Sequence, residues 1–197
     1  MASPSGLNNI PTADIVPEGI LVWQAWGTFA EDADDTYVAG LKFGPAKNIE
    51  LGLDHKLGSG DSGPLAFQGK YRFFTNESGL SATLGLANVN TDRDQGGPNF
   101  PYAALTQDFG GVRGHLGYEW QDDNEGLFLG LDHPAQMDLT LRADWTQTDD
   151  GEESMSSIGF IYTGSDPFLV EAWASFPTAA GADTSWTLKF DYVIPFR

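Results

Sequence analysis

Charged residues in this sequence fall on alternate positions within short runs of mostly apolar residues. Because side chains alternate across a β-strand, the charges of one run share one face. Both signs occur there in similar numbers, and the residues are Lys42, Glu50, Asp54, Lys56, Lys70, Arg72, Arg113, His115, Glu119, Asp132, Arg142, Asp144, Glu171, Lys189 and Asp191. On the inner face of a closed sheet, such charges must pair as salt bridges or stay hydrated. We predict that they line a lumen, either a narrow water-filled pore, which we favour, or a lumen plugged by paired side chains.

The three histidines offer little basis for catalysis. Hydrolytic chemistry needs a histidine beside a serine or an acid. His55 lies on the apolar phase of its run, His133 precedes a proline in a short turn, and His115 shares the polar face with Arg113 and Glu119. A hydrogen-bonded histidine in the wall is the simpler interpretation of His115. No nucleophile elbow and no pair of metal ligands accompanies them, so we predict no enzyme activity, no cofactor and no metal site.

The composition excludes several classes of protein. The chain of 197 residues has a net charge of −18, and nucleic acid is therefore not an expected partner, since phosphate binding needs a basic patch. It contains no cysteine, which excludes disulfides and thiolate metal sites. No run of about 18 apolar residues is present, so no membrane-spanning helix is predicted, although membrane-spanning strands would show no such run either.

Alternation of apolar and polar residues recurs in about twelve runs of roughly 8–12 residues, close to the 9–11 that a tilted strand needs to cross a bilayer. The clearest is the last run, Ser185 to Arg197, in which six large apolar residues occupy every second position from Trp186 to Phe196. The phase is ambiguous in the first run, Gly19 to Ala30, and in the sixth, Tyr102 to Phe109. Residues 1–18 are rich in Pro, Asn and Ser, so we predict an irregular arm at 1–18 and one β-domain at 19–197.

The connections between the runs alternate in length and charge. Links after even-numbered runs are short, whereas links after odd-numbered runs are longer and acidic, with about fifteen carboxylates against the single base Arg93. Examples are the stretches 31–35, 91–98, 122–125 and 149–153. Such sorting places all the long, acidic loops on one rim of a barrel. An acidic rim attracts cations, and we expect it to stay solvated without a specific metal site.

The pattern resembles that of bacterial outer-membrane β-barrels. Aromatic residues lie near the ends of many apolar faces, as in the belts at lipid interfaces, and the closing run is similar to the terminal strand of that class. Pro195 and Arg197 depart from that terminal pattern. The small and charged residues of the other face suit a crowded barrel interior. The resemblance implies an all-β fold: a closed, antiparallel, up-and-down transmembrane barrel of about twelve strands with short periplasmic turns and longer extracellular loops.

Three functional hypotheses follow from these patterns. The first is a porin-like passive channel for small hydrophilic solutes in the bacterial outer membrane, with lipid around its wall and a cation-attracting extracellular rim. The second is a non-conducting structural or interaction barrel with a salt-bridged lumen, which would be a subunit of an envelope assembly. The third is a soluble β-sandwich or lipocalin-like binding protein. The sequence does not fix the oligomeric state or the identity of a solute.

Overall fold

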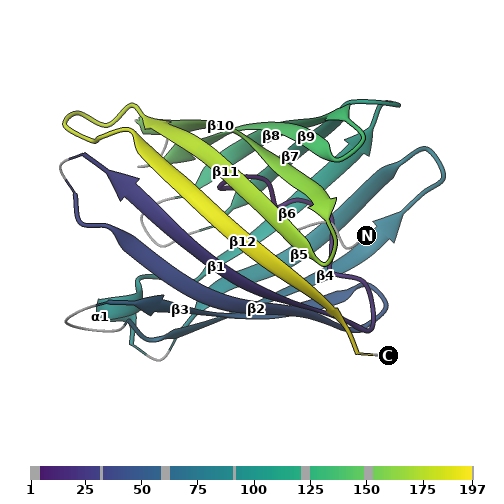
Figure 1. Cartoon of the computed structure of the whole chain (residues 1–197), viewed down its shortest axis with the longest axis horizontal. Helices are drawn as coiled ribbons and strands as arrows, with labels where there is room; N and C mark the ends of the chain where they lie inside the picture. The colour runs from purple at the N-terminus through teal and green to yellow at the C-terminus, as the bar shows by residue number, and fades with distance from the viewer. Residues whose placement is uncertain are drawn as a thin grey trace.

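The protein is an antiparallel β-barrel (Figure 1). The computed structural model describes residues 5–31, 33–58, 63–90, 92–120, 125–148 and 153–196. Within these ranges the strands are β1 (Ile20–Ala30), β2 (Thr36–Ala46), β3 (Ile49–Leu57), β4 (Leu65–Thr75), β5 (Leu80–Val89), β6 (Phe100–Asp108), β7 (Arg113–Glu119), β8 (Gly126–Gln136), β9 (Leu139–Thr148), β10 (Glu153–Ser165), β11 (Phe168–Pro177) and β12 (Ser185–Pro195). In the part of the chain that the structure describes, no helix is long and apolar enough to cross a bilayer.

Each strand pairs with its neighbours in sequence, and β1 pairs with β12 to close the barrel. The closing register runs without a break from Ile20 opposite Pro195 to Ala30 opposite Ser185. A closed ladder leaves no row of unpaired backbone groups, which is the condition for a sheet to span a membrane. The predicted closed, up-and-down barrel of about twelve strands is confirmed.

The two phases of each strand face the outer surface and the lumen. Large apolar side chains such as Leu84, Leu129 and Phe190 lie on the outer surface, whereas Lys70 and Arg142 are only 6% and 5% exposed. The two ambiguous strands are also settled. In β1 the even positions point inward, with Gln24 buried and Trp23 exposed, and in β6 the side chains of residues 102, 104 and 106 are buried. An apolar outside and a polar inside are typical of a transmembrane barrel.

The rims differ as the link lengths predict. Short turns at 47–48, 76–79, 109–112, 137–138 and 166–167 form one rim, which we call the short-turn rim. The links after β1, β3, β5, β7, β9 and β11 leave from the opposite rim, which we call the long-loop rim and where the helix α1 (Arg93–Gly96) also lies. Parts of these links fall outside the described residues. One detail differs from the sequence interpretation, because β8 continues through His133 to Gln136, so that the turn after it is only Met137 and Asp138.

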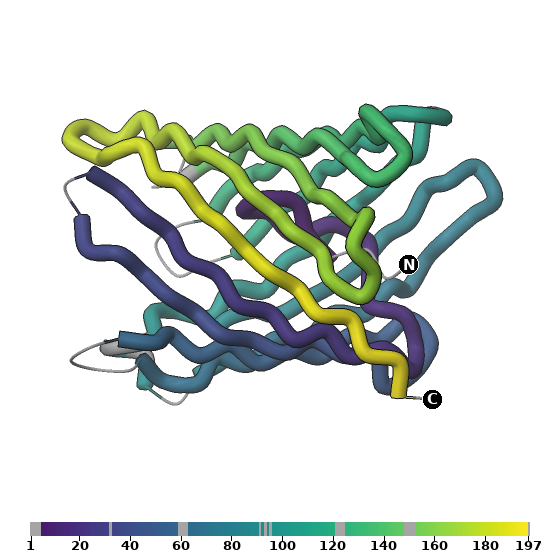
Figure 2. Tube along the Cα trace, viewed as in Figure 1, coloured from purple at the N-terminus to yellow at the C-terminus, as the bar shows by residue number. Residues whose placement is uncertain are grey.

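Residues 5–18 fold back into the barrel as an irregular arm. Figure 2 shows this purple segment crossing the space enclosed by the strands before it leads into β1. The arm turns tightly at its tip, where the amide of Leu7 donates to the carbonyl oxygen of Ile10 at 3.0 Å and Gly6 forms an isolated bridge with Pro11. Leu7, Ile10 and Val16 are buried, although they lie outside the sheet. The arm therefore occupies the lumen.

A charge on the outer wall should destabilise the barrel according to its depth. Leu129, 45% exposed in the middle of β8, faces outward, so Leu129→Arg should lower the free energy of unfolding by about 2–4 kcal/mol, as for an arginine at the bilayer midplane. Met137 is 97% exposed in the short turn after the same strand, and Met137→Arg should cost about 0–1 kcal/mol. Urea unfolding in lipid vesicles measures both values. Equal and small effects would mean that this face does not contact lipid.

Candidate functional site

Polar side chains from many of the strands point into the lumen. Its residues form two groups: wall residues that hold the arm, and a network of ion pairs within the wall itself. We call the first group the arm-binding residues, and it consists of Lys42, Glu50, Lys70, Thr106, Arg113, Asp144, Ser157 and Ser175. The second group, the wall ion network, consists of Gln24, Arg142, Glu171, Lys189 and Asp191.

Lys70 of β4 binds the arm through backbone carbonyl groups. Its Nζ donates to the carbonyl oxygen of Ser5, to that of Thr12 at 3.1 Å and to that of Asp14 at 2.9 Å. An ammonium group has three donors and no acceptor, so these carbonyls use its full capacity. Lys70 therefore binds the arm both before its turn, at Ser5, and after it, at Thr12 and Asp14.

Glu50 of β3 lies directly opposite Lys70 in the β3–β4 register, and its carboxylate accepts hydrogen bonds from the arm. It accepts hydrogen bonds from the Ser5 hydroxyl at 2.6 Å and from the amide of Val16 at 2.7 Å. Lys42 of β2 adds a hydrogen bond from its Nζ to the Ser5 hydroxyl at 3.1 Å. Because Glu50 is 2% exposed, its charge is balanced within the protein by the neighbouring lysines.

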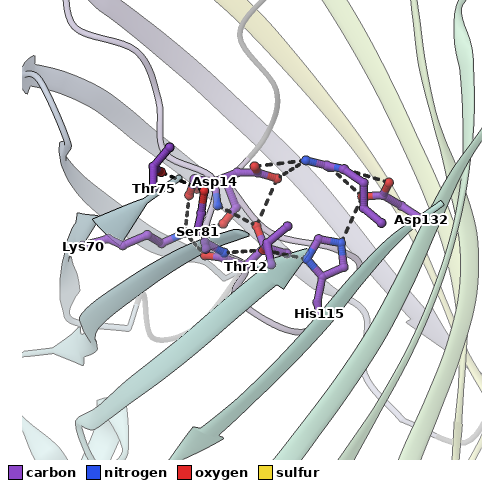
Figure 3. A network of polar contacts seen from close by, with 11 residues as sticks. Thr12, Asp14, Lys70, Thr75, Ser81, His115 and Asp132 are labelled. Carbon is purple, nitrogen blue, oxygen red and sulfur yellow. Dashed lines mark hydrogen bonds and ion pairs between the residues drawn. The ribbon is translucent and has the colours of Figure 1, made fainter. Parts of the chain in front are cut away.

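Arg113 of β7 joins the arm to a chain of polar wall groups. Its guanidinium donates to both carboxylate oxygens of Asp14 at 3.0 Å and makes a fork-like pair with Asp132 of β8 at 3.0 and 2.6 Å. Asp132 also contacts Nε2 of His115 at 3.1 Å, and Nδ1 of His115 lies 2.9 Å from the Thr106 hydroxyl. Figure 3 shows Asp14 of the arm between Lys70 on one side and His115 and Asp132 on the other. Both ring nitrogens of His115 are thus engaged in wall contacts.

The tip of the arm is held by β9, β10 and β11. Asp144 accepts hydrogen bonds from the amides of Asn8 at 2.9 Å and Asn9 at 3.3 Å. The side-chain amide of Asn9 donates to the hydroxyl groups of Ser157 at 2.5 Å and Ser175 at 2.9 Å. Ser175 lies near the long-loop end of β11, so the tip reaches well into the half of the barrel that faces the long loops.

Apolar contacts support the same tip. Leu7 and Ile10 pack with Phe128 and Tyr102 in a small buried cluster inside the lumen. A side chain at Gly130 of β8 would collide with them, because a Cβ there would lie 2.4 Å from Cδ1 of Leu7. The wall is therefore shaped to accept the two apolar residues of the tip.

The wall ion network joins residues of four strands without using the arm. Arg142 of β9 pairs with Glu171 of β11, and Glu171 also contacts Nζ of Lys189 at 2.8 Å. Lys189 lies 3.6 Å from Asp191 on the same strand, and Asp191 accepts a hydrogen bond from Gln24 of β1 at 3.0 Å. Glu171 and Asp191 are both 1% exposed. Buried charges of this kind persist because each has a partner.

A cavity of 460 Å³ remains on the long-loop side of the arm. The arm residues 5–11 form part of its lining, and Trp26 and Trp173 contribute aromatic surface. Polar groups are present too, including Asp54, which accepts a hydrogen bond from Gln68 at 2.7 Å. The cavity thus offers both aromatic and hydrogen-bonding surface to a small hydrophilic molecule.

The other charges predicted for the lumen lie near the rims. Arg72 is half-buried and donates to the side-chain oxygen of Asn48 at 3.3 Å, next to a short turn. Glu119 is half-buried near the long-loop end of β7. Lys56 is exposed near the long-loop end of β3, where it lines a second cavity of 410 Å³. Within the described ranges, no group of three or more His, Asp or Glu side chains is placed to hold a metal ion.

The charge pattern includes the arm-binding residues Lys42, Glu50, Lys70, Arg113 and Asp144, but it gives no indication that their partner is the arm. Asn8, Asn9 and Asp14 belong to the arm, which has no periodicity from which a binding position follows. The alternation of charges also does not predict the large inward side chains of Phe128 and Trp173. The available signal was the presence of Leu7, Ile10 and Val16 in an otherwise polar segment, since such residues seek burial.

The fold of this barrel is similar to that of solved porin structures. KdgM porin in complex with disordered oligogalacturonate has a TM-score of 0.72 at 11% identity, covering 87% of this chain and 98% of that chain. NanC porin has a TM-score of 0.67 at 9% identity, and the match covers 86% of this chain and 98% of that chain. The outer membrane protein Omp33 of Acinetobacter baumannii has a TM-score of 0.61 at 9% identity, and the match covers 90% of this chain and 99% of that chain. No family model and no curated protein sequence matches the chain. The shared property is the fold of bacterial outer-membrane barrels.

Breaking the wall ion network should be costly. Glu171→Ala removes the partner of buried Arg142, and we expect a loss of about 3–5 kcal/mol in the free energy of unfolding. The double variant Arg142→Met/Glu171→Leu removes both charges and should stay within about 1–2 kcal/mol of the original protein, since apolar replacement of a buried pair is often neutral. Urea unfolding of the reconstituted protein measures the difference. A single variant as stable as the unchanged protein would show that Arg142 finds another partner or water.

Proposed function

We propose that the protein is a channel of the bacterial outer membrane through which small hydrophilic solutes pass. The observation that carries this proposal is an apolar outer wall around a polar lumen that still contains a cavity of 460 Å³. A structural barrel needs neither a large polar interior nor an unfilled space. Solutes would enter from the long-loop rim, which by analogy with outer-membrane barrels faces the outside of the cell.

The long-loop rim favours cationic or uncharged solutes. Its described links carry exposed carboxylates at Glu31, Asp34, Asp35, Asp94 and Glu125. Other acidic positions of this rim, such as Asp122 and Asp149, lie outside the described residues. A rim of one sign raises the local concentration of counter-ions and repels anions. We therefore propose hydroxyl-rich or cationic solutes, unlike the polyanionic oligogalacturonate with which KdgM porin was solved.

No reaction is part of this proposal. The inward His115 is held between Thr106 and Asp132, and Asp132 is in turn paired with Arg113. Each of these contacts fixes the position of a wall side chain. Together they support a structural role for His115 at the point where the arm meets the wall.

A second candidate function is supported by the arm itself. If residues 5–18 stay in the lumen permanently, the barrel is sealed and would serve as a structural or interaction protein of the cell envelope. The buried position of the arm and its many polar contacts favour this candidate. The two candidates differ in whether solutes ever cross.

Planar bilayers test the channel directly. The purified full chain and a variant that lacks residues 5–16 are reconstituted, and ion currents are recorded. We expect discrete conductance steps in at least one of the two preparations. Barrels that insert with heat-modifiable gel migration but never conduct in either form would contradict the channel and support the sealed barrel.

The acidic rim predicts cation selectivity that depends on salt. In the conducting protein, Glu31→Gln/Asp34→Asn/Asp35→Asn should lower the cation-to-anion permeability ratio by about half at low ionic strength, because screening is weak there. A matched neutralisation of the short-turn rim, Glu77→Gln/Asp138→Asn/Asp166→Asn, should lower it less. Reversal potentials under a salt gradient measure the ratio. An unchanged ratio in the first variant would show that the rim does not select ions.

A further inference from the structure

We propose that residues 5–16 are a displaceable plug that keeps the channel closed from the short-turn rim. This inference rests on the channel function proposed above and assigns its regulation to a segment of the same chain. It states that the arm leaves the lumen and returns to it while the barrel wall stays intact. Three observations support this proposal: the position of the arm in the lumen, its attachment through side chains, and the partners that the wall residues keep when the arm is absent.

The arm obstructs the path along the barrel axis. Its contacts begin at Glu50, near the short-turn end of β3, and extend to Ser175, near the long-loop end of β11. Ser5, Thr12 and Ala13 between these points are each at most 2% exposed. A solute in the 460 Å³ cavity therefore meets the arm before it can reach the short-turn rim.

The arm is attached to the wall through side chains and not through the strand ladder. Among the described residues, the backbone of the arm first pairs with a strand at Glu18, which bridges Gly44, followed by the Gly19 amide, which donates to the Gly44 carbonyl at 3.0 Å. Upstream of that point, the hydrogen bonds and ion pairs between the described residues of the arm and the wall use wall side chains such as Lys70 and Asp144. The barrel closes through β1 and β12 without any contribution from residues 5–16. Removal of the arm thus breaks no strand pairing.

The wall groups keep partners when the arm leaves. Lys70 remains opposite Glu50, Arg113 keeps its pair with Asp132, and the Ser157 hydroxyl lies 3.0 Å from that of Ser175. An empty lumen admits water to the remaining polar groups. Departure of the arm therefore leaves no isolated charge in an apolar environment, which would otherwise prohibit the open state.

The tip is built to move as one unit. The hydrogen bond from the Leu7 amide to the Ile10 carbonyl and the bridge between Gly6 and Pro11 hold the turn together without the wall. Only a few apolar side chains anchor it, chiefly Leu7 and Ile10 against Phe128 and Tyr102. A compact tip held at one end by β1 can swing out of the lumen as a tethered plug.

Deletion and tethering test the plug in opposite directions. The variant lacking residues 5–16 should show a mean conductance about tenfold or more above that of the full chain, which corresponds to a plug that occupies the lumen about nine-tenths of the time.

Tethering tests the plug in the opposite direction. Asn9→Cys/Ser175→Cys links the tip to β11 through a short, reducible bis-methanethiosulfonate reagent. The chain has no native cysteine, so the reagent reacts only at the introduced pair. Linkage should lower the conductance about tenfold, and reduction should restore it.

The matched control joins two wall residues. Thr28 and Thr187 are directly opposite on β1 and β12, with their hydroxyl groups 2.8 Å apart, and neither belongs to the arm-binding residues. Thr28→Cys/Thr187→Cys therefore places the same linker within the wall while the arm stays free. Its conductance should be the same before and after linkage. Circular dichroism and heat-modifiable migration confirm that each variant is folded before it is recorded. If the deletion variant does not fold, the tethering pair and its control decide the question alone.

The outcomes separate the plug from the channel. Equal conductance in the full chain and the deletion variant, or in the tethered protein before and after reduction, would overturn the plug and leave the channel standing. Absence of conductance in every variant would overturn the channel, and the plug with it. High conductance after deletion together with closure by the arm tether, but not by the wall tether, supports the plug.

Discussion

A sheet in lipid must close, because an unpaired strand edge would leave backbone donors and acceptors without water. Here β1 and β12 pair over the full length of β1, and this pairing closes the wall. Since side chains alternate across each strand, closure divides the chain into an apolar outer set and a polar inner set. Polar contacts also span the seam inside the lumen: Gln24 meets Asp191, and the Thr28 hydroxyl lies 2.8 Å from that of Thr187. The inner polar groups therefore contribute to holding the first and last strands together.

The charges of the lumen follow from the same closure. Once the strands curve inward, side chains on neighbouring strands are brought within reach, and oppositely charged residues pair because water is scarce. Arg142 reaches Glu171 across β10, where the residue opposite Arg142 is Gly159, which places no side chain between them. The ion network occupies the wall formed by β9 to β12 and β1, whereas Glu50, Lys70 and Arg113 on β3, β4 and β7 bind the arm. Asp144 of β9 also depends on the arm, because it accepts hydrogen bonds from the amides of Asn8 and Asn9. Buried charge in the lumen is thus satisfied in two ways, by pairing between wall residues and by contacts with the arm.

The fold was predictable from the sequence because it depends on short-range periodicity. Alternation identified the strands, link lengths identified the rims, and an even number of strands placed both ends of the barrel at one rim. The phases of β1 and β6 were ambiguous because each carries apolar residues inward as well as outward, such as Val22 and Tyr102, which the packed lumen accommodates. The position of the arm was not predictable. Its contacts join residues far apart in the sequence, such as Asn9 and Ser175, and they exist only after the barrel has closed around them.

The function of the barrel depends on whether its lumen is filled by side chains of the strands or by a separate segment of the chain. Small barrels are commonly filled by side chains of their own strands, which cannot leave without unfolding the wall. In this protein a separate segment, attached at the start of β1, supplies the tip that packs against Phe128 and Tyr102. Its polar contacts replace water at wall groups such as Asp144, whose hydration would serve equally well in an open lumen. In the proposed plug, the occupancy of the arm in the lumen is set by the small difference between its hydrogen bonds to the wall and those that water would make there, plus the burial of Leu7 and Ile10. That balance is what a closed but openable channel requires, whereas a permanent seal would gain more from side chains fixed to the strands.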